Sequence, residues 1–165
     1  RIGHRVGIRA RAFGMDIVAY DPFVRADGVV ASELRADVVD FHEALARSDF
    51  VSCHMPLTVE TRDLFDATAF AAMKPTAYFV NAARGGVVDE NALIDALQTG
   101  RIAGAGLDVR VTEPPAPSPL DTMDNVVLTP HIAALTAEAQ ERVVASLCGD
   151  VAAVLRGEIP AHRAC

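Results

Sequence analysis

Cysteine, tryptophan and long apolar runs are scarce or absent in this sequence. It has three cysteines, none of them in a C-x-x-C pair, and no tryptophan. This pattern argues against a disulfide framework and against a cysteine-based zinc site, so Cys53, Cys148 and Cys165 are expected to be buried or idle thiols. No apolar stretch approaches the roughly 20 residues that cross a bilayer, and the first residues lack the apolar centre of a signal peptide. We therefore expect a cytoplasmic protein with no membrane partner.

Positive charge is also in short supply. Lysine and arginine total 15 against 22 aspartates and glutamates, which gives a formal net charge of −7 at pH 7. Nucleic-acid binders concentrate basic residues on one face, whereas the arginines here are scattered, so no nucleic-acid partner is expected. His4, His42 and His162 lack a metal-ligand spacing such as H-E-x-x-H, and no metal is assigned.

The length and the apolar pattern predict one α/β domain. A chain of 165 residues is about one domain long, and short apolar runs alternate with helical patterns. Such alternation is typical of a parallel sheet covered on both faces, so we predict a Rossmann-like, doubly wound fold. Strands are expected at residues 16–20, 50–54, 77–80, 103–109 and 126–128. Helices are expected before Gly14, around 41–47, in patches within 61–73, at 89–97 and at 137–155, and none is assigned between 22 and 37.

An acidic residue follows the first predicted strand at a dinucleotide-binding interval. Asp21 comes eighteen residues after Gly3, close to the roughly 20 residues at which such folds place an acid on the ribose hydroxyls. A carboxylate there accepts hydrogen bonds from the ribose diol and repels a 2′-phosphate, which favours NAD over NADP. The alternative is that Asp21-Pro22 simply starts a turn. Of the G-x-G-x-x-G fingerprint only the tail, Arg1-Ile2-Gly3, is present.

A series of motifs runs through the chain in a fixed order. They are Arg1-Ile-Gly3, Ala12-Phe-Gly-Met15, Tyr20-Asp-Pro22, His54-Met-Pro-Leu-Thr58, Thr61-Arg62, Asn81-Ala-Ala-Arg-Gly-Gly-Val-Val-Asp89, Gly104-Ala-Gly-Leu-Asp-Val109, Glu113-Pro114 and Thr129-Pro-His-Ile-Ala133. Together they resemble the D-isomer-specific 2-hydroxyacid dehydrogenases, which include glycerate, phosphoglycerate, formate and D-lactate dehydrogenases. The resemblance implies an oxidoreductase that transfers a hydride between NAD and a small D-2-hydroxy acid or 2-keto acid.

The resemblance also implies a larger architecture. Members of this family carry a substrate-binding lobe ahead of the nucleotide lobe, and their last helix packs on that lobe. We expect residues 1–165 to form a partial NAD-binding domain without that lobe or the first, central strand, with 137–157 as the C-terminal helix. Such a fragment is expected to turn over substrate poorly or not at all, and a homodimer is expected for the full-length parent.

Three residues are expected to carry the reaction, by resemblance. Arg84 would grip the substrate carboxylate and the adjacent carbonyl oxygen, because a planar guanidinium pairs bidentately with a carboxylate. His131 would protonate the substrate oxygen as hydride arrives, or remove the proton in the reverse direction, because its ordinary pKa lies near neutrality. Glu113 would pair with His131, favouring the charged imidazolium and fixing the ring.

The remaining family positions are expected to contact the cofactor. Asp108 would accept a hydrogen bond from the nicotinamide carboxamide, the alternative being a cap at the strand end. Asp89 is instead interpreted as a helix N-cap. The other expected cofactor contacts are Arg1, Ile2, Gly3, Asp21, Pro22, His54, Pro56, Thr61, Ala83, Arg84, His131 and Ala133.

Departures from the family pattern leave the reaction intact and the substrate open. Arg110 stands where an aromatic residue is common, Gly7 where alanine is common, and Ala134 where glycine often follows the histidine. Two alternatives remain: an NAD-responsive interaction protein of the corepressor type, which shares this scaffold, and an inactive fragment.

Overall fold

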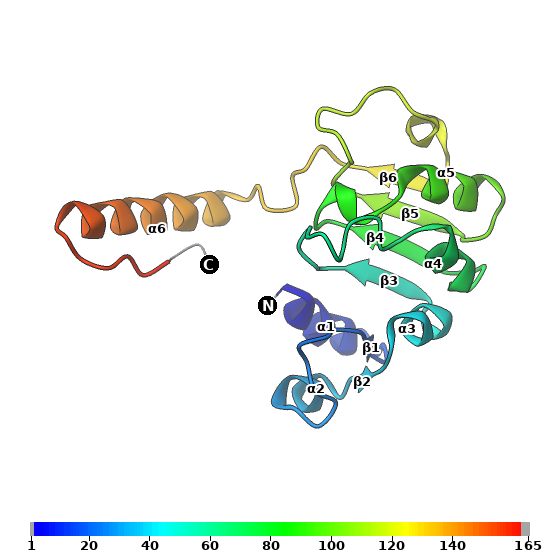
Figure 1. Ribbon diagram of the computed structural model, residues 1–165, viewed down its shortest axis with the longest axis horizontal. Helices are drawn as coiled ribbons and strands as arrows, with labels where there is room; N and C mark the ends of the chain where they lie inside the picture. The colour runs from blue at the N-terminus through cyan, green and yellow to red at the C-terminus, as the bar shows by residue number, and fades with distance from the viewer. Residues whose placement is uncertain (1, 163–165) are drawn as a thin grey trace. The chain divides into compact units, whose positions relative to one another are not determined.

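The computed structural model describes residues 2–162 and divides into two compact units, one ending at Pro130 and the other beginning at His131 (Figure 1). The helices are α1 Ile2–Ala12, α2 Val29–Leu34, α3 Phe41–Arg47, α4 Ala67–Ala72, α5 Glu90–Gln98 and α6 Ala137–Leu155, with 3₁₀ turns η1 Gly85–Val87 and η2 Pro119–Thr122. The strands are β1 Val18–Ala19, β2 Asp37–Val38, β3 Phe50–Cys53, β4 Tyr78–Asn81, β5 Gly104–Leu107 and β6 Val126–Leu128. The two units are described separately below.

The strands of the first unit are all parallel. Four of them form one sheet in the order β3-β4-β5-β6, and β1 and β2 form a second, two-stranded sheet. Among the described residues β3 pairs only with β4 and β1 pairs only with β2, so the two sheets share no hydrogen-bonded strand. The predicted α/β fold with a parallel sheet is confirmed.

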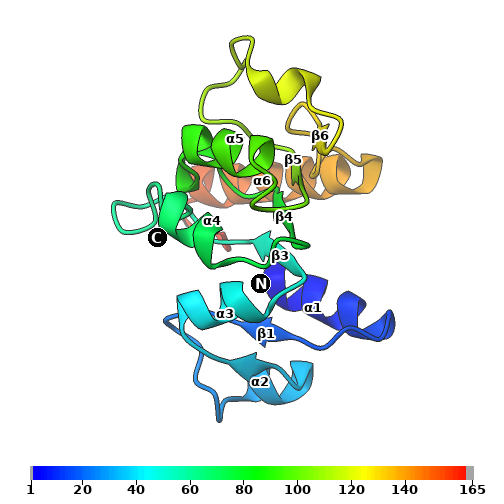
Figure 2. The ribbon, with the colours of Figure 1, turned by 90° about the vertical axis from the view of Figure 1, so that its right-hand side faces the viewer.

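The main hydrophobic core lies between the four-stranded sheet and helices α3, α4 and α5, which cover one face of it (Figure 2). Phe79 of β4 is completely buried, and its ring lies 4.8 Å from that of Phe65 and 5.5 Å from that of Phe70, measured between centroids. Residues alternate along a strand, so the neighbouring side chains point to the opposite face. There Phe50 and Tyr78 stack at 5.6 Å and are half exposed.

One part of the first unit differs from the sequence-based expectation. The stretch from 22 to 37 contains α2 and the start of β2, although no element was predicted there. Within 61–73 the predicted helical patch is α4, whereas residues 61–63 form a turn and Phe65 bridges to Val88. Helix α4 begins only where the Asp66 carboxylate caps it by accepting from the Ala69 amide.

Helix caps elsewhere agree with the prediction. The Asp89 carboxylate accepts from the amides of Asn91 and Ala92 at the start of α5, which confirms it as an N-cap. Helix α1 ends just before Gly14, whose φ of +80° suits glycine.

The second unit contains one long helix. Thr136 caps α6 by accepting from the Ala139 amide, and the helix ends before Gly157, which has a φ of +75°. The predicted helix at 137–155 is therefore confirmed. Within residues 2–162 no helix combines the length and the apolar character that crossing a membrane requires.

Candidate functional site

Arg84 lies in a turn that follows β4 and is held by a buried side chain. Asn81, only 1% exposed, donates from its amide to the Arg84 carbonyl at 3.0 Å and accepts from the Ala83 amide at 3.0 Å. The Arg84 side chain is exposed, and its guanidinium donates to the Ala83 carbonyl at 2.6 Å. The turn thus presents a permanent positive charge at the carboxyl end of the sheet.

The glycine pair after Arg84 brings neighbouring loops into contact. A Cβ atom on Gly85 would lie 1.9 Å from the Arg110 carbonyl oxygen, so only glycine fits against the chain that leaves β5. Gly86 lies against the Leu57 side chain, and its carbonyl accepts from the Asp63 amide at 3.1 Å. The loops that follow β3, β4 and β5 therefore meet at this edge.

Asp108 joins the ends of three strands. It is 8% exposed, its amide donates to the Asn81 carbonyl at 2.9 Å, and its Oδ1 accepts from the Thr129 hydroxyl at 2.6 Å. This arrangement gives the carboxylate the strand-end role of the alternative interpretation. It also places Asp108 at the carboxyl edge, where the cofactor role would require it.

Glu113 lies on the loop between β5 and η2. Its Oε1 accepts from the Arg110 amide at 3.2 Å, so the carboxylate folds back toward the end of β5. Because Gly85 contacts the same residue, Arg84 and Glu113 are linked through the backbone of Arg110. The structure thus brings the Arg84 turn, Asp108 and the Glu113 loop together.

A second cluster joins the first turn of α1 to the end of β3. A Cβ atom on Gly3 would lie 3.2 Å from Cδ2 of His54, so glycine allows the helix to approach the histidine closely. Burial lowers the pKa of His54, and Ser52 Oγ lies 3.0 Å from its Nε2. The first turn of α1, which includes Ile2, contains no acidic residue. A helix N-terminus without carboxylates suits an anionic group such as a pyrophosphate.

The loop after β3 is closed by its own side chains. Thr61 Oγ1 donates to the Pro56 carbonyl at 2.7 Å and accepts from the Thr58 amide at 2.8 Å. These bonds give Pro56 and Thr61 a loop-shaping role. They also keep the loop beside Gly86, through Leu57.

Asp21 follows β1 and is exposed. Its Oδ1 accepts from the Phe23 amide at 2.9 Å, so the turn at Asp21-Pro22 that the alternative interpretation required is present. A carboxylate that shapes the turn while exposed to solvent is also compatible with the ribose role.

His131 and Ala133 belong to the second unit and are exposed. His131 has a φ of +55°, in the left-handed region that non-glycine residues seldom occupy. Such conformations cost roughly 1–3 kcal/mol and cluster at functional sites. Arg1, the first predicted cofactor contact, lies outside the described residues.

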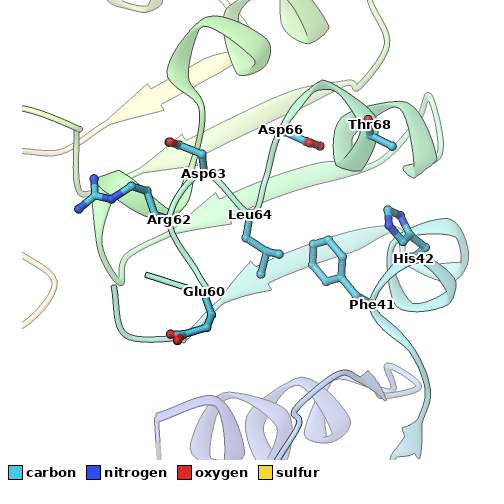
Figure 3. A pocket seen from close by; sticks show the side chains of 8 residues that line it. All are labelled: Phe41, His42, Glu60, Arg62, Asp63, Leu64, Asp66 and Thr68. Atoms are coloured by element: carbon cyan, nitrogen blue, oxygen red, sulfur yellow. The ribbon is translucent and has the colours of Figure 1, made fainter. Parts of the chain in front are cut away.

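A pocket in the first unit is lined by none of the predicted site residues. It has a volume of about 350 Å³ and lies between α3, the loop before α4 and α4 itself; Figure 3 shows Leu64 and Phe41 pointing toward one another within it. Its rim mixes acidic and basic side chains. Within residues 2–162 no three His, Cys, Asp or Glu side chains group as a metal site would require.

Two residues at the site escaped sequence reasoning. Asn81 holds the Arg84 turn, and the Arg110 backbone donates to the Glu113 carboxylate and lies against Gly85. A polar residue that ends an apolar strand is a signal that could have identified Asn81. Arg110 was noticed only as a departure from the family pattern.

Known proteins resemble this chain over nearly all of its length. D-3-phosphoglycerate dehydrogenase of Mycobacterium leprae is 48% identical over 158 residues, which cover 96% of this chain and 30% of that protein. The chain thus spans about a third of the length of such curated relatives.

Solved structures share the fold. The D-lactate dehydrogenase of Lactobacillus jensenii with NAD+ aligns with a TM-score of 0.87 at 31% identity, covering 99% of this chain and 52% of that one. The holo form of D-mandelate dehydrogenase of Rhodotorula graminis aligns with a TM-score of 0.88 at 36% identity, covering 96% and 46%.

A sequence profile agrees with these alignments. The family described as D-isomer specific 2-hydroxyacid dehydrogenase, NAD binding domain, matches residues 1–133. This stretch contains both clusters described above, and its cofactor is the NAD that the sequence predicted. The chain therefore belongs to the D-isomer specific 2-hydroxyacid dehydrogenases, as their NAD binding domain.

Proposed function

We propose that the protein is an NAD-dependent dehydrogenase that interconverts a small D-2-hydroxy acid and the matching 2-keto acid. The observation that carries this proposal is the contact between the Arg84 turn and the Glu113 loop at the carboxyl end of a parallel sheet, beside Asp108. The Arg84 cation suits a small anionic substrate at the edge where such sheets bind their ligands.

NAD fits the described residues, and when bound it supplies the hydride acceptor or donor. The first turn of α1, close to His54 and free of acids, suits the pyrophosphate. Asp21 would accept from the ribose hydroxyls, and Asp108 would accept from the carboxamide. Further cofactor contacts would come from Pro22, Pro56, Thr61, Ala83 and Ala133, as the family resemblance implies.

Residues of the chain itself bind the substrate and transfer the proton. Arg84 binds and orients the substrate carboxylate through its planar fork. His131 gives a proton to the substrate oxygen in the reductive direction and takes it back in the oxidative direction. Glu113 is proposed to pair with that imidazole and fix its orientation, as the family resemblance implies.

Keto-acid reduction tests this proposal directly. NADH oxidation would be followed with hydroxypyruvate and other short 2-keto acids, using the protein complete with its substrate-binding lobe. Arg84→Lys is expected to raise KM strongly, because an ammonium lacks the bidentate fork. His131→Asn is expected to reduce kcat by roughly 10²–10⁴. Full activity of the His131 variant would refute the acid–base assignment.

Cofactor choice provides a second test. Asp21→Ser removes the charge that repels a 2′-phosphate, so the preference for NADH over NADPH is expected to shrink. Binding of each nucleotide would be measured by calorimetry. An unchanged preference would show that Asp21 only forms its turn.

We also propose that residues 1–165 are a partial NAD-binding domain, which accounts for the break between its sheets. A strand outside these residues would pair with both β1 and β3, each of which has one partner among the described residues. The isolated chain is expected to show little turnover, because the wall that excludes water from the site would lie on the substrate lobe. Turnover by the purified 165-residue chain would contradict this.

We propose further that the protein works in the cytoplasm as a homodimer, as the family resemblance implies. Size-exclusion chromatography coupled to light scattering would measure the mass of the protein in solution. A monomer at micromolar concentration would refute the dimer.

A further inference from the structure

Arg110 is a buried cation with an unusually complete set of partners. Its side chain is 8% exposed, its Nε donates to Glu90 at 3.0 Å, and its Nη2 donates to the second Glu90 oxygen at 2.5 Å. Nη2 also donates to the Ser118 hydroxyl at 3.1 Å, and Nη1 lies 3.5 Å from an Asp121 oxygen. We call these four side chains the Arg110 cluster.

The Arg110 cluster ties both ends of one loop to a helix. Arg110 lies near the start of the loop, Ser118 ends it, Asp121 belongs to η2, and Glu90 is the first residue of α5. Glu90 Oε2 also accepts from the Val111 amide at 3.4 Å. The guanidinium thus crosses the base of a loop whose middle carries Glu113.

The electrostatics support a firm attachment. Arg110 lowers the pKa of Glu90 through their hydrogen bonds, and Glu90 in turn raises the pKa of Arg110. The pair therefore stays charged across the working pH range. A bidentate guanidinium–carboxylate pair that is mostly buried holds one geometry better than an exposed pair does.

We propose that Arg110 is a positioning residue, which fixes the loop and thereby places the Glu113 carboxylate beside the Arg84 turn. The same residue binds Glu113 through its amide and contacts Gly85 through its carbonyl, so a shift of Arg110 moves both. This inference rests on the proposed function for the role of Glu113. The Arg110 guanidinium donates to Glu90 and Ser118, so it acts on Glu113 through the loop.

Arg110→Met tests the inference, with Arg110→Lys as the conservative variant. Arg47→Met is the matched control, because Arg47 also bridges two carboxylates, those of Asp37 and Glu43, but on exposed surfaces far along the chain. All would be made in the protein with its substrate lobe. Folding would be checked first by the unfolding midpoint.

Hydrogen exchange measures how firmly the loop is held, and it does not require enzyme activity. In Arg110→Met, peptides covering residues 108–121 are expected to exchange faster, while Arg110→Lys lies between it and the wild type. The Arg47 variant is expected to leave this segment unchanged. Unchanged exchange in Arg110→Met would overturn the inference.

Steady-state kinetics test whether the role of Glu113 in the reaction depends on Arg110. Glu113 is proposed to assist the acid–base step, so a displaced Glu113 is expected to slow that step. In Arg110→Met kcat for keto-acid reduction is expected to fall roughly tenfold with KM changing less, and Arg110→Lys is expected to recover part of the loss. A looser loop with an unchanged kcat would overturn the positioning role. An inactive wild type would overturn the proposed function instead, while the exchange data would still decide whether Arg110 holds the loop.

Discussion

Replacing Gly85 by alanine is the sharpest test of how the site is assembled. The added Cβ would lie 1.9 Å from the Arg110 carbonyl oxygen, 2.1 Å from its carbonyl carbon and 2.5 Å from the Val111 amide nitrogen. Ordinary contact begins at 3.4 Å, so the two loops would have to separate by about 1.5 Å. The obstacle is backbone, which cannot rotate away as a flexible side chain can.

The expected cost follows from that overlap. Overpacking of a close-packed interior costs typically 1–3 kcal/mol, and a backbone clash belongs at the upper end, at about 3 kcal/mol. For a chain of this size that corresponds to a melting temperature lower by roughly 6–12 °C. Because Arg84 and Glu113 flank the contact, activity is expected to fall further than stability does.

Gly106→Ala is the matched control within the same sheet. The nearest atom to its added Cβ is Val80 Cγ2 at 4.0 Å, and alanine is better than glycine in a strand by roughly 0.5–1 kcal/mol. Urea unfolding followed by circular dichroism would compare both variants with the wild type. If Gly85→Ala unfolded at the same urea concentration as Gly106→Ala, the close approach of the two loops would be refuted.

Three further predictions concern the core, a turn and the response to acid. Phe79→Ala is expected to lower the free energy of unfolding by about 3–5 kcal/mol, because a fully buried ring leaves a cavity, and denaturant titration measures this. Asn81→Ala is expected to reduce kcat/KM for the keto acid more than it reduces thermal stability, because the Arg84 turn loses both hydrogen bonds that Asn81 makes to it; an unaltered kcat/KM would contradict this. Arg110 holds the pKa of Glu90 below its ordinary 4.5, so this carboxylate stabilises the fold above about pH 4.5 and loses that effect as the pH falls through its lower folded pKa. The free energy of unfolding, measured from pH 3 to 7, should therefore fall less steeply on acidification in Arg110→Met than in the wild type.

Strongly patterned segments could be predicted from the sequence, and weakly patterned ones could not. The apolar run 50–54 and the capped helix at 89–97 were found because burial on a sheet or one helical face imposes a clear period. Helix α2 has only 6 residues and strand β2 only 2, and the pairing of β2 with β1 joins residues as far apart in the sequence as Val18 and Asp37. A local pattern does not contain that information.

The candidate site also contains residues that could be predicted from the sequence and residues that could not. Arg84, Asp108 and Glu113 were placed by motif and by their position after strands, and the structure brings their loops together. Asn81 and Arg110 act through bonds to backbone atoms and to distant carboxylates, as in the contact between Arg110 and Glu90. Such roles become visible only when both partners are located in space.

The buried pair of Arg110 and Glu90 also constrains how this domain can evolve. A neutral residue at 110 alone would leave the Glu90 carboxylate partly buried without its cation, and a neutral residue at 90 alone would strand the guanidinium. Each single change is therefore expected to be less fit than the double change. The two positions form an epistatic couple, so whichever of them changes first is expected to lower stability until the other changes as well.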